Sequence, residues 1–215
     1  MKSPQAKPLS EVFGAKPVKV RVIGDVHGKL NKFFVLCNDA ESDIIQCGDL
    51  GFRTHYKELI KFAKSFPYNI TIIRGNHDDY INHYDLPPNL RLVKDYGCLY
   101  NNRIGYVRGA YSIDKHERIE GVDWFAEEEL SINKLTNASY YFEAIQPKIM
   151  ITHTIPSSIV KLFIPNNRIK TRTQQGLQGV YDVFKPSLWV FGHFHHPHVI
   201  QDGETTFICL SELQY

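Results

Sequence analysis

The sequence contains no long apolar run and no clustered cysteines, and each absence excludes a class of protein. No stretch approaches the about 18 consecutive apolar residues of a transmembrane helix. The N-terminus lacks the apolar core of a secretory signal peptide. We therefore expect a cytoplasmic protein with no membrane partner. The four cysteines form no Cys-x-x-Cys motif, so a thiolate metal site is excluded and buried free thiols are expected.

A strong net charge is also absent. The formal charge is +2, and residues 1–17 alone carry three lysines against one glutamate, which leaves the remainder at zero. No general basic field attracts nucleic acid, so a nucleic-acid partner is possible but not favoured. At 215 residues the chain is long enough for one domain. We predict a flexible, proline-containing N-terminal arm over residues 1–17 and one domain over 18–215.

Apolar periodicity predicts an α/β protein. In the first half, strands and helices alternate as Val18–Asp25, Lys29–Asn38, Asp43–Asp49, His55–Ser65 and Asn69–Gly75. This alternation is typical of a parallel sheet with right-handed crossovers.

The second half predicts a less regular succession of strands and helices. The predicted strands are Leu90–Val93, Ile104–Arg108, Lys148–His153, Leu188–Gly192, and a hairpin of Val199–Gln201 and Thr206–Leu210. The predicted helices are Phe125–Leu130, Ala138–Ile145 and Thr173–Phe184, and Thr154–Thr171 is predicted to be irregular.

Polar side chains of one chemical kind follow five of the predicted strands. These segments are Gly24-Asp25-Val26-His27-Gly28, Gly48-Asp49, Gly75-Asn76-His77-Asp78, Thr152-His153-Thr154 and Gly192-His193-Phe194-His195. Strand ends are where α/β proteins bind ligands. Oxygen and imidazole donors without thiolates suit hard or borderline divalent ions. The donors are too many for one tetrahedral ion, so the set indicates a two-metal site of the kind that promotes displacement at phosphorus.

These five segments, in this order, resemble the pattern of the calcineurin-like metallophosphoesterase superfamily, and they extend over residues 24–195. The resemblance implies a layered αββα sandwich of mixed sheets. It also implies two divalent ions that share a nucleophilic hydroxide. Manganese is the first expectation for the metal, with iron, zinc, nickel, cobalt or magnesium as alternatives. The implied ligands are Asp25, His27 and His195 for the first ion, Asn76, His153 and His193 for the second, and Asp49 as the bridge.

The resemblance also assigns a role to His77, which would protonate the leaving oxygen or stabilise its charge. Arg53 stands where the protein phosphatase and diadenosine tetraphosphatase branches have an arginine, so it is a candidate phosphate contact. Phe52 replaces the aspartate that orients the histidine in the protein phosphatases. Asp78 cannot be assumed to take over that role, and the chain lies between subfamilies.

The expected function is therefore phosphoester hydrolysis, as a phosphatase or phosphodiesterase acting on a phosphorylated small molecule, a nucleotide or a phosphoprotein. A nuclease is one alternative, because Arg168, Lys170 and Arg172 follow His153 in the sequence. A non-catalytic scaffold of the same fold is another. The sequence leaves open whether segment 154–172 borders the substrate and whether 110–130 forms a substrate wall or packs on the sheet edge.

Overall fold

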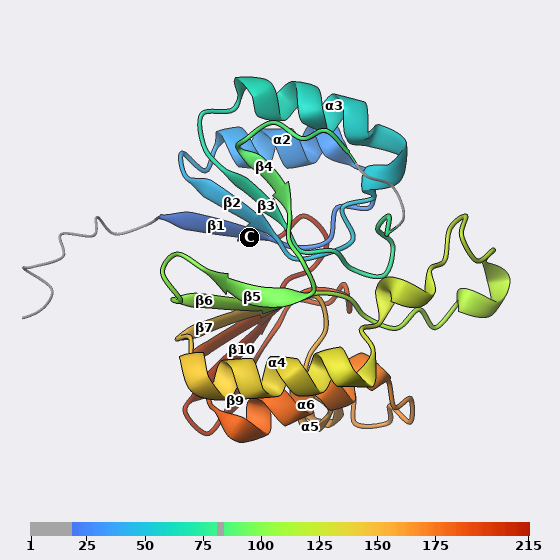
Figure 1. Cartoon of the computed structure of the whole chain (residues 1–215), viewed down its shortest axis with the longest axis vertical. Helices are drawn as coiled ribbons and strands as arrows, with labels where there is room; N and C mark the ends of the chain where they lie inside the picture. The colour runs from blue at the N-terminus through green and yellow to red at the C-terminus, as the bar shows by residue number, and fades with distance from the viewer. Residues whose placement is uncertain (1–18, 81–83) are drawn as a thin grey trace, which may run out of the picture.

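A computed structural model of the chain describes residues 19–80 and 84–215, with the backbone alone for 52–54. Two sheets pack face to face, and helices cover the outer face of each (Figure 1). This is the αββα sandwich of mixed α/β type that the sequence predicts. The predicted arm at 1–17 lies outside the described residues.

The first sheet is parallel and comes from consecutive parts of the chain. Its strands lie in the order β1 (Val20–Ile23), β2 (Asp43–Gln46), β3 (Ile70–Ile72) and β4 (Leu90–Leu92). Two helices cover it, α2 (Leu30–Asn38) and α3 (Phe52–Ser65). The predicted strand and helix order is confirmed, although α3 begins at Phe52 and not at His55.

The second sheet is mixed, with the strand order β5-β6-β7-β8-β10-β9. Its interior strands β6, β7, β8 and β10 run parallel, and the edge strands β5 and β9 are antiparallel to their neighbours. The strands are β5 (Tyr96–Leu99), β6 (Ile104–Val107), β7 (Ile149–Thr152), β8 (Leu188–Phe191), β9 (His198–Asp202) and β10 (Thr205–Cys209). The predicted C-terminal hairpin is confirmed, whereas β5 was not predicted.

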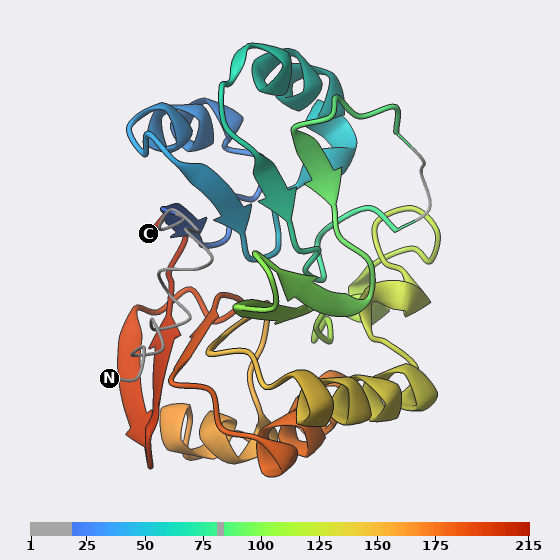
Figure 2. The same cartoon turned by 60° about the vertical axis from the view of Figure 1, so that its left-hand side comes forward.

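Three helices, α4 (Ile132–Ile145), α5 (Ser157–Phe163) and α6 (Arg172–Val183), cover the outer face of this sheet (Figure 2). The prediction that 154–171 is irregular throughout was wrong, because α5 lies within it. The helix predicted over Phe125–Leu130 is only a 3-10 turn, Ala126–Glu128. Helix α4 begins at Ile132, earlier than predicted, since the Ser131 hydroxyl accepts a hydrogen bond from the Lys134 N–H and caps it.

Three apolar layers hold this arrangement together. Phe33, Leu59 and neighbours fill the space between the first sheet and its helices, and Phe142 and Trp189 belong to the layer under α4 and α6. Between the sheets lies a third layer that includes Ile45, Ile73, Ile151 and Val190. Close packing on both faces fixes the sheets, and thus the strand ends, relative to each other. None of the helices in residues 19–80 and 84–215 combines the length and hydropathy needed to span a bilayer.

Candidate metal centre

The five polar segments meet at the carboxyl ends of strands from both sheets. Three follow β1, β2 and β3, and two follow β7 and β8. Backbone hydrogen bonds join the loops: the amides of Val26 and His27 donate to the carbonyl of Asp49, and that of Gly192 donates to the carbonyl of His153. All seven predicted ligands therefore lie in one cluster.

One group of donors gathers around Asp25. The Nε2 atom of His195 lies 2.9 Å from Asp25 Oδ2 and 2.9 Å from the Nε2 atom of His27. His27 Nε2 is also 3.7 Å from Asp25 Oδ2 and 3.9 Å from Asp49 Oδ2. Donor atoms around one ion at metal–ligand distances of about 2.1 Å stand about 3–3.4 Å apart. Asp25, His27, Asp49 and His195 could thus hold one ion.

A second group shares Asp49. The Nε2 atom of His153 lies 3.2 Å from Asp49 Oδ1 and 3.1 Å from Asn76 Oδ1. The other ring nitrogen of His153 is 3.0 Å from the Cys47 carbonyl, which can accept its proton and leave Nε2 free for an ion. Asp49, His153 and His193 could hold a second ion, and Asp49 is the residue common to both groups.

The ligand loops adopt strained backbone conformations. His27, Asp49, His193 and His195 have φ angles of 48°, 57°, 71° and 52°. A left-handed conformation costs a non-glycine residue roughly 1–2 kcal/mol. Strain of this kind concentrates at functional sites, where the surrounding structure holds it in place.

Two of the glycines in the motifs are required for space. A Cβ atom at Gly192 would lie 2.1 Å from Asp25 Oδ1, and one at Gly75 would lie 2.3 Å from Asp49 Oδ1. Neither residue has a positive φ. Because they lack a Cβ atom, these two glycines leave room for the Asp25 and Asp49 carboxylates beside the backbone. A turn that needs a left-handed residue is not the reason for glycine at either position.

Asp78 organises the backbone of the ligand loops. Its Oδ2 atom accepts hydrogen bonds from the amides of Asp49 (2.9 Å) and Gly75 (2.8 Å), and its Oδ1 atom accepts one from Gly51 (3.0 Å). The side chain is 3% exposed. Asp78 thus joins the loops after β2 and β3 and does not orient His77.

The electrostatics of the cluster suit cations. Burial lowers the pKa of His153, but Asp49 and Asp25 raise it overall to about 9. Burial raises the pKa of Asp25, yet His153 and its hydrogen-bonding neighbours lower it below its usual range. Burial and the nearby His153 lower the pKa of His193 to about 4. Buried carboxylates with neighbouring imidazoles form a donor set that fits two divalent ions, which would displace the imidazolium protons.

A buried polar chain orients Asn76. The Nδ2 atom of Asn76 donates to the Ser112 hydroxyl (3.1 Å), which donates to Glu128 Oε2 (2.5 Å). Glu128 Oε1 accepts from the Phe125 amide. With its nitrogen held by Ser112, Asn76 presents its oxygen to His153. Sequence reasoning missed Ser112 and Glu128 as site residues, because no local motif marks them.

Arg118 is a further neighbour that sequence reasoning did not assign. Its Nη2 atom lies 2.8 Å from each ring nitrogen of His77 and 2.7 Å from Asp114 Oδ2. The pKa of His77 is lowered, first by burial and then by the positive charge of Arg118, against the opposing effect of Asp49. The amide of His77 donates to Asp49 Oδ1 (2.7 Å). His77 is thus held between the shared carboxylate and a cation.

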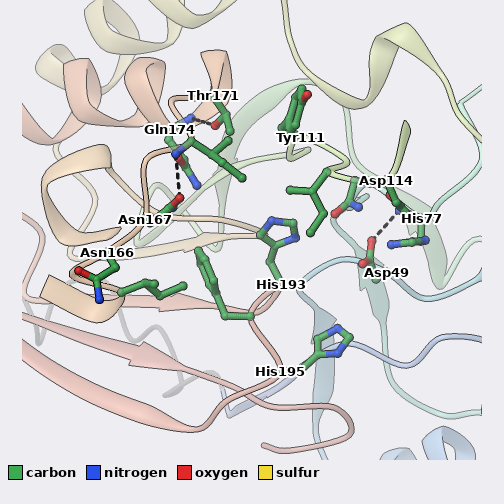
Figure 3. A pocket seen from close by; sticks show the side chains of 15 residues that line it. Asp49, His77, Tyr111, Asp114, Asn166, Asn167, Thr171, Gln174, His193 and His195 are labelled. Carbon is green, nitrogen blue, oxygen red and sulfur yellow. Dashed lines mark hydrogen bonds between the residues drawn. The ribbon is translucent and has the colours of Figure 1, made fainter. Parts of the chain in front are cut away.

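A cavity of about 570 Å³ opens from the cluster. Figure 3 shows Asp49, His77, His193 and His195 at one part of it and Asn167, Thr171 and Gln174 at another. Segments 110–114 and 164–171 both contribute to its wall, although Ser112 and Phe125 are buried in packing. The side chain of Arg53 lies outside the described residues, so its predicted phosphate contact stays a prediction.

The fold and the strand-end Asp/His cluster define a two-sheet α/β protein with a candidate dinuclear centre. The chain belongs to the calcineurin-like phosphoesterase family, whose model matches residues 18–197. No curated protein matches the sequence.

Three solved structures are similar to the chain at low sequence identity, and the first of them shares its fold. The phosphopantetheinyl hydrolase of Mycobacterium tuberculosis is 12% identical with a TM-score of 0.52, over 90% of this chain and 89% of that one. A conserved predicted phosphoesterase of Streptococcus pneumoniae is 13% identical with a TM-score of 0.44, over 91% and 72%. The sulfate thiohydrolase of Thermus thermophilus is 12% identical with a TM-score of 0.43, over 85% and 38%.

Proposed function

We propose that the protein hydrolyses phosphoesters with the help of two divalent metal ions. The observation that carries this proposal is the position of Asp49, whose carboxylate belongs to both donor groups. Asp25, His27 and His195 complete the first site, and Asn76, His153 and His193 complete the second. Manganese is the proposed ion, as the family resemblance implies, and donors of oxygen and imidazole nitrogen without thiolate are compatible with it.

When bound, two such ions would supply Lewis acidity at the phosphoryl oxygens and an activated water. The chain itself orients the reaction. The His77 amide fixes the shared Asp49 carboxylate, and the His77 ring lies at the cavity that the substrate would enter. Arg118 disfavours the imidazolium form of His77. We therefore propose that His77 acts at the leaving oxygen mainly as a neutral hydrogen-bond donor, the second of the two roles that the resemblance implies.

The substrate proposed is a small phosphoester. The nuclease alternative needs cations along the binding surface, and Arg168, Lys170 and Arg172 are not among the described residues that line the cavity. The scaffold alternative would tolerate loss of ligands, whereas the complete donor set supports catalysis. The structural relative from Mycobacterium tuberculosis is named for hydrolysis involving a phosphopantetheinyl group, but 12% identity gives no basis for assigning its substrate to this chain.

Metal analysis combined with kinetics tests the proposal. Manganese-loaded protein should contain close to two equivalents of metal and hydrolyse p-nitrophenyl phosphate or bis-p-nitrophenyl phosphate. Asp49→Asn should lose both metal and activity, since one carboxylate serves both sites. Asp39→Asn, at an exposed position away from the cluster, is the matched control. Saturation at one equivalent, or full activity in Asp49→Asn, would overturn the proposal.

A further inference from the structure

The cavity beside the metal centre continues into a second region with a different character. Beyond His77 and His193 its lining includes Tyr111, Ile113 and the segment 164–171. Figure 3 shows Tyr111 and Asn167 around this part of the cavity. Its volume of about 570 Å³ exceeds what one phosphate group needs. The excess space adjoins the reacting centre, so a substrate's esterifying group would extend into it.

The outer region combines exposed isoleucines with the polar side chains of Asn166, Asn167 and Thr171. Ile113, Ile164 and Ile169 are 66%, 38% and 49% exposed, and all three line this cavity. Single exposed isoleucines are ordinary, but three around one cavity indicate an apolar binding surface. Phe194 adds an aromatic side chain to the lining of the same cavity.

Gln174 provides a further polar group in this region. It lies in the first turn of α6 and is only 4% exposed, yet it lines the cavity. Its backbone amide donates to the Thr171 hydroxyl, whereas its side-chain carboxamide forms no hydrogen bond with any residue that the structure describes. Its carboxamide atoms are not among the buried side-chain atoms that lack a partner in the described part of the chain. The carboxamide is therefore open to the cavity, and it is a candidate hydrogen-bonding group for a ligand.

Positive charge is directed away from the outer region. Lys170 and Arg172 line a separate hollow beside Gly176, and the Arg172 guanidinium donates to the Glu129 carbonyl. Among the described residues, no lysine or arginine lines the cavity. Arg118 lies at the His77 end and is paired with Asp114. An anionic group placed among the isoleucines would lose its hydration without gaining a counter-charge.

We propose that the outer region binds the uncharged portion of a phosphoester substrate, a group of nucleoside size that hydrogen-bonds to the Gln174 carboxamide and packs against the isoleucines. This proposal builds on the proposed function and narrows its substrate class. It favours phosphoesters that carry a single phosphate and neutral alcohols, whether monoesters or diesters, over polynucleotides, polyphosphates and acidic phosphopeptides. A nucleobase and a linear amide chain present the same hydrogen-bonding chemistry, and the experiment separates them.

Two diesters with the same leaving group test the proposal kinetically. The p-nitrophenyl ester of thymidine 5′-monophosphate and methyl p-nitrophenyl phosphate differ only in the alcohol. The manganese-loaded protein should show a kcat/KM at least about 10-fold higher for the thymidine ester. Gln174→Leu should reduce that ratio about 5- to 10-fold, as expected for one lost hydrogen bond, and leave the methyl ester nearly unchanged. Gln175→Leu is the matched control, because Gln175 is exposed and lines the separate hollow.

A charge introduced at an exposed wall position provides the reciprocal test. A 3′-phosphate on the thymidine ester should lower kcat/KM about 10-fold, and Ile169→Lys should recover several-fold of that loss. Any of three results would overturn the proposal. The first is an equal kcat/KM for the thymidine and methyl esters, and the second is an effect of Gln175→Leu as large as that of Gln174→Leu. The third is a preference of the wild-type protein for the 3′-phosphorylated ester.

A binding measurement separates this inference from the proposed activity. Calorimetric titration with thymidine, and with an uncharged linear diamide of similar size, requires no turnover. If either compound binds, and Gln174→Leu but not Gln175→Leu weakens that binding, the result supports the proposed binding role of the outer region even if no ester is hydrolysed. The compound that binds more strongly then shows whether the region recognises a nucleobase or a linear amide chain. If neither thymidine nor the diamide binds to protein that hydrolyses methyl p-nitrophenyl phosphate, the proposed role of the outer region is refuted and the proposed hydrolytic function is not.

Discussion

Glu128 makes the protein's stability sensitive to pH in a way that one substitution should remove. The side chain is 1% exposed and is bonded to Ser112 and to the Phe125 amide. Burial raises its pKa from 4.5 to about 7, although these two hydrogen bonds oppose the shift. Below pH 4.5 the carboxyl is protonated in both the folded and the unfolded chain. Between pH 4.5 and 7 only the unfolded chain releases the proton, so the free energy of unfolding falls as pH rises.

The shift from 4.5 to about 7 corresponds to about 3 kcal/mol. Glu128→Gln imitates the protonated form: its carboxamide oxygen can accept from the Phe125 amide, and its NH2 group can donate to the Ser112 oxygen, which reverses the direction of the Ser112–Glu128 hydrogen bond. The variant should therefore resemble the wild type near pH 4.5 and become more stable than it by up to about 3 kcal/mol at pH 8.

Urea unfolding of chelator-treated protein from pH 4.5 to 8.5 measures this difference, since nearby cations would stabilise the carboxylate. Glu127→Gln, at the exposed neighbouring position, controls for the change in net charge. A stability difference between Glu128→Gln and wild type that does not vary with pH would refute the raised pKa. A variant less stable than wild type at pH 8 would show that the carboxylate itself is favoured there.

Three further substitutions test other parts of the site. Gly192→Ala should reduce metal content in elemental analysis, since the new Cβ would contact Asp25, and Gly179→Ala in α6, where the new Cβ would meet only the Ser139 hydroxyl at 3.1 Å, should not. Asp78→Ala should lower the free energy of unfolding by about 3 kcal/mol or more, because three amides lose their acceptor; a loss below 1 kcal/mol would contradict this role. Arg118→Met should raise the pKa of His77 in an NMR titration of metal-free protein, and an unchanged value would mean that Arg118 does not set it.

The positions of the candidate ligands could be predicted because they follow strands directly. Asp25, Asp49 and Asn76 each come after an apolar run, and parallel strands bring their carboxyl ends to one edge. Order along the chain was thus enough to predict proximity. Neither the association of Asp78 with three backbone amides nor the contact between Gly192 and Asp25 is visible in the sequence, since both depend on how the loops approach one another.

The polar neighbours of the ligands could not be predicted for a related reason. Glu128 and Arg118 reach Asn76 and His77 across 40 or more residues through an irregular segment, so no periodicity relates them. Helix α5 was missed because it is short and its segment contains two prolines. The sequence left open whether segment 154–172 borders the substrate, and its apolar and amide side chains are the ones that line the cavity.

The division of the sheets along the chain gives the metal centre a mechanical consequence. Strands β1–β4 come from residues 20–92 and strands β5–β10 from 96–209, and each sheet has its own apolar layer with its helices. Asp25 and Asp49 belong to the first half, and His153 and His193 to the second. An ion bound between them would add a cross-link to the apolar layer that the two halves already share. Chelation would then remove that cross-link and leave the shared apolar layer alone to hold the halves together.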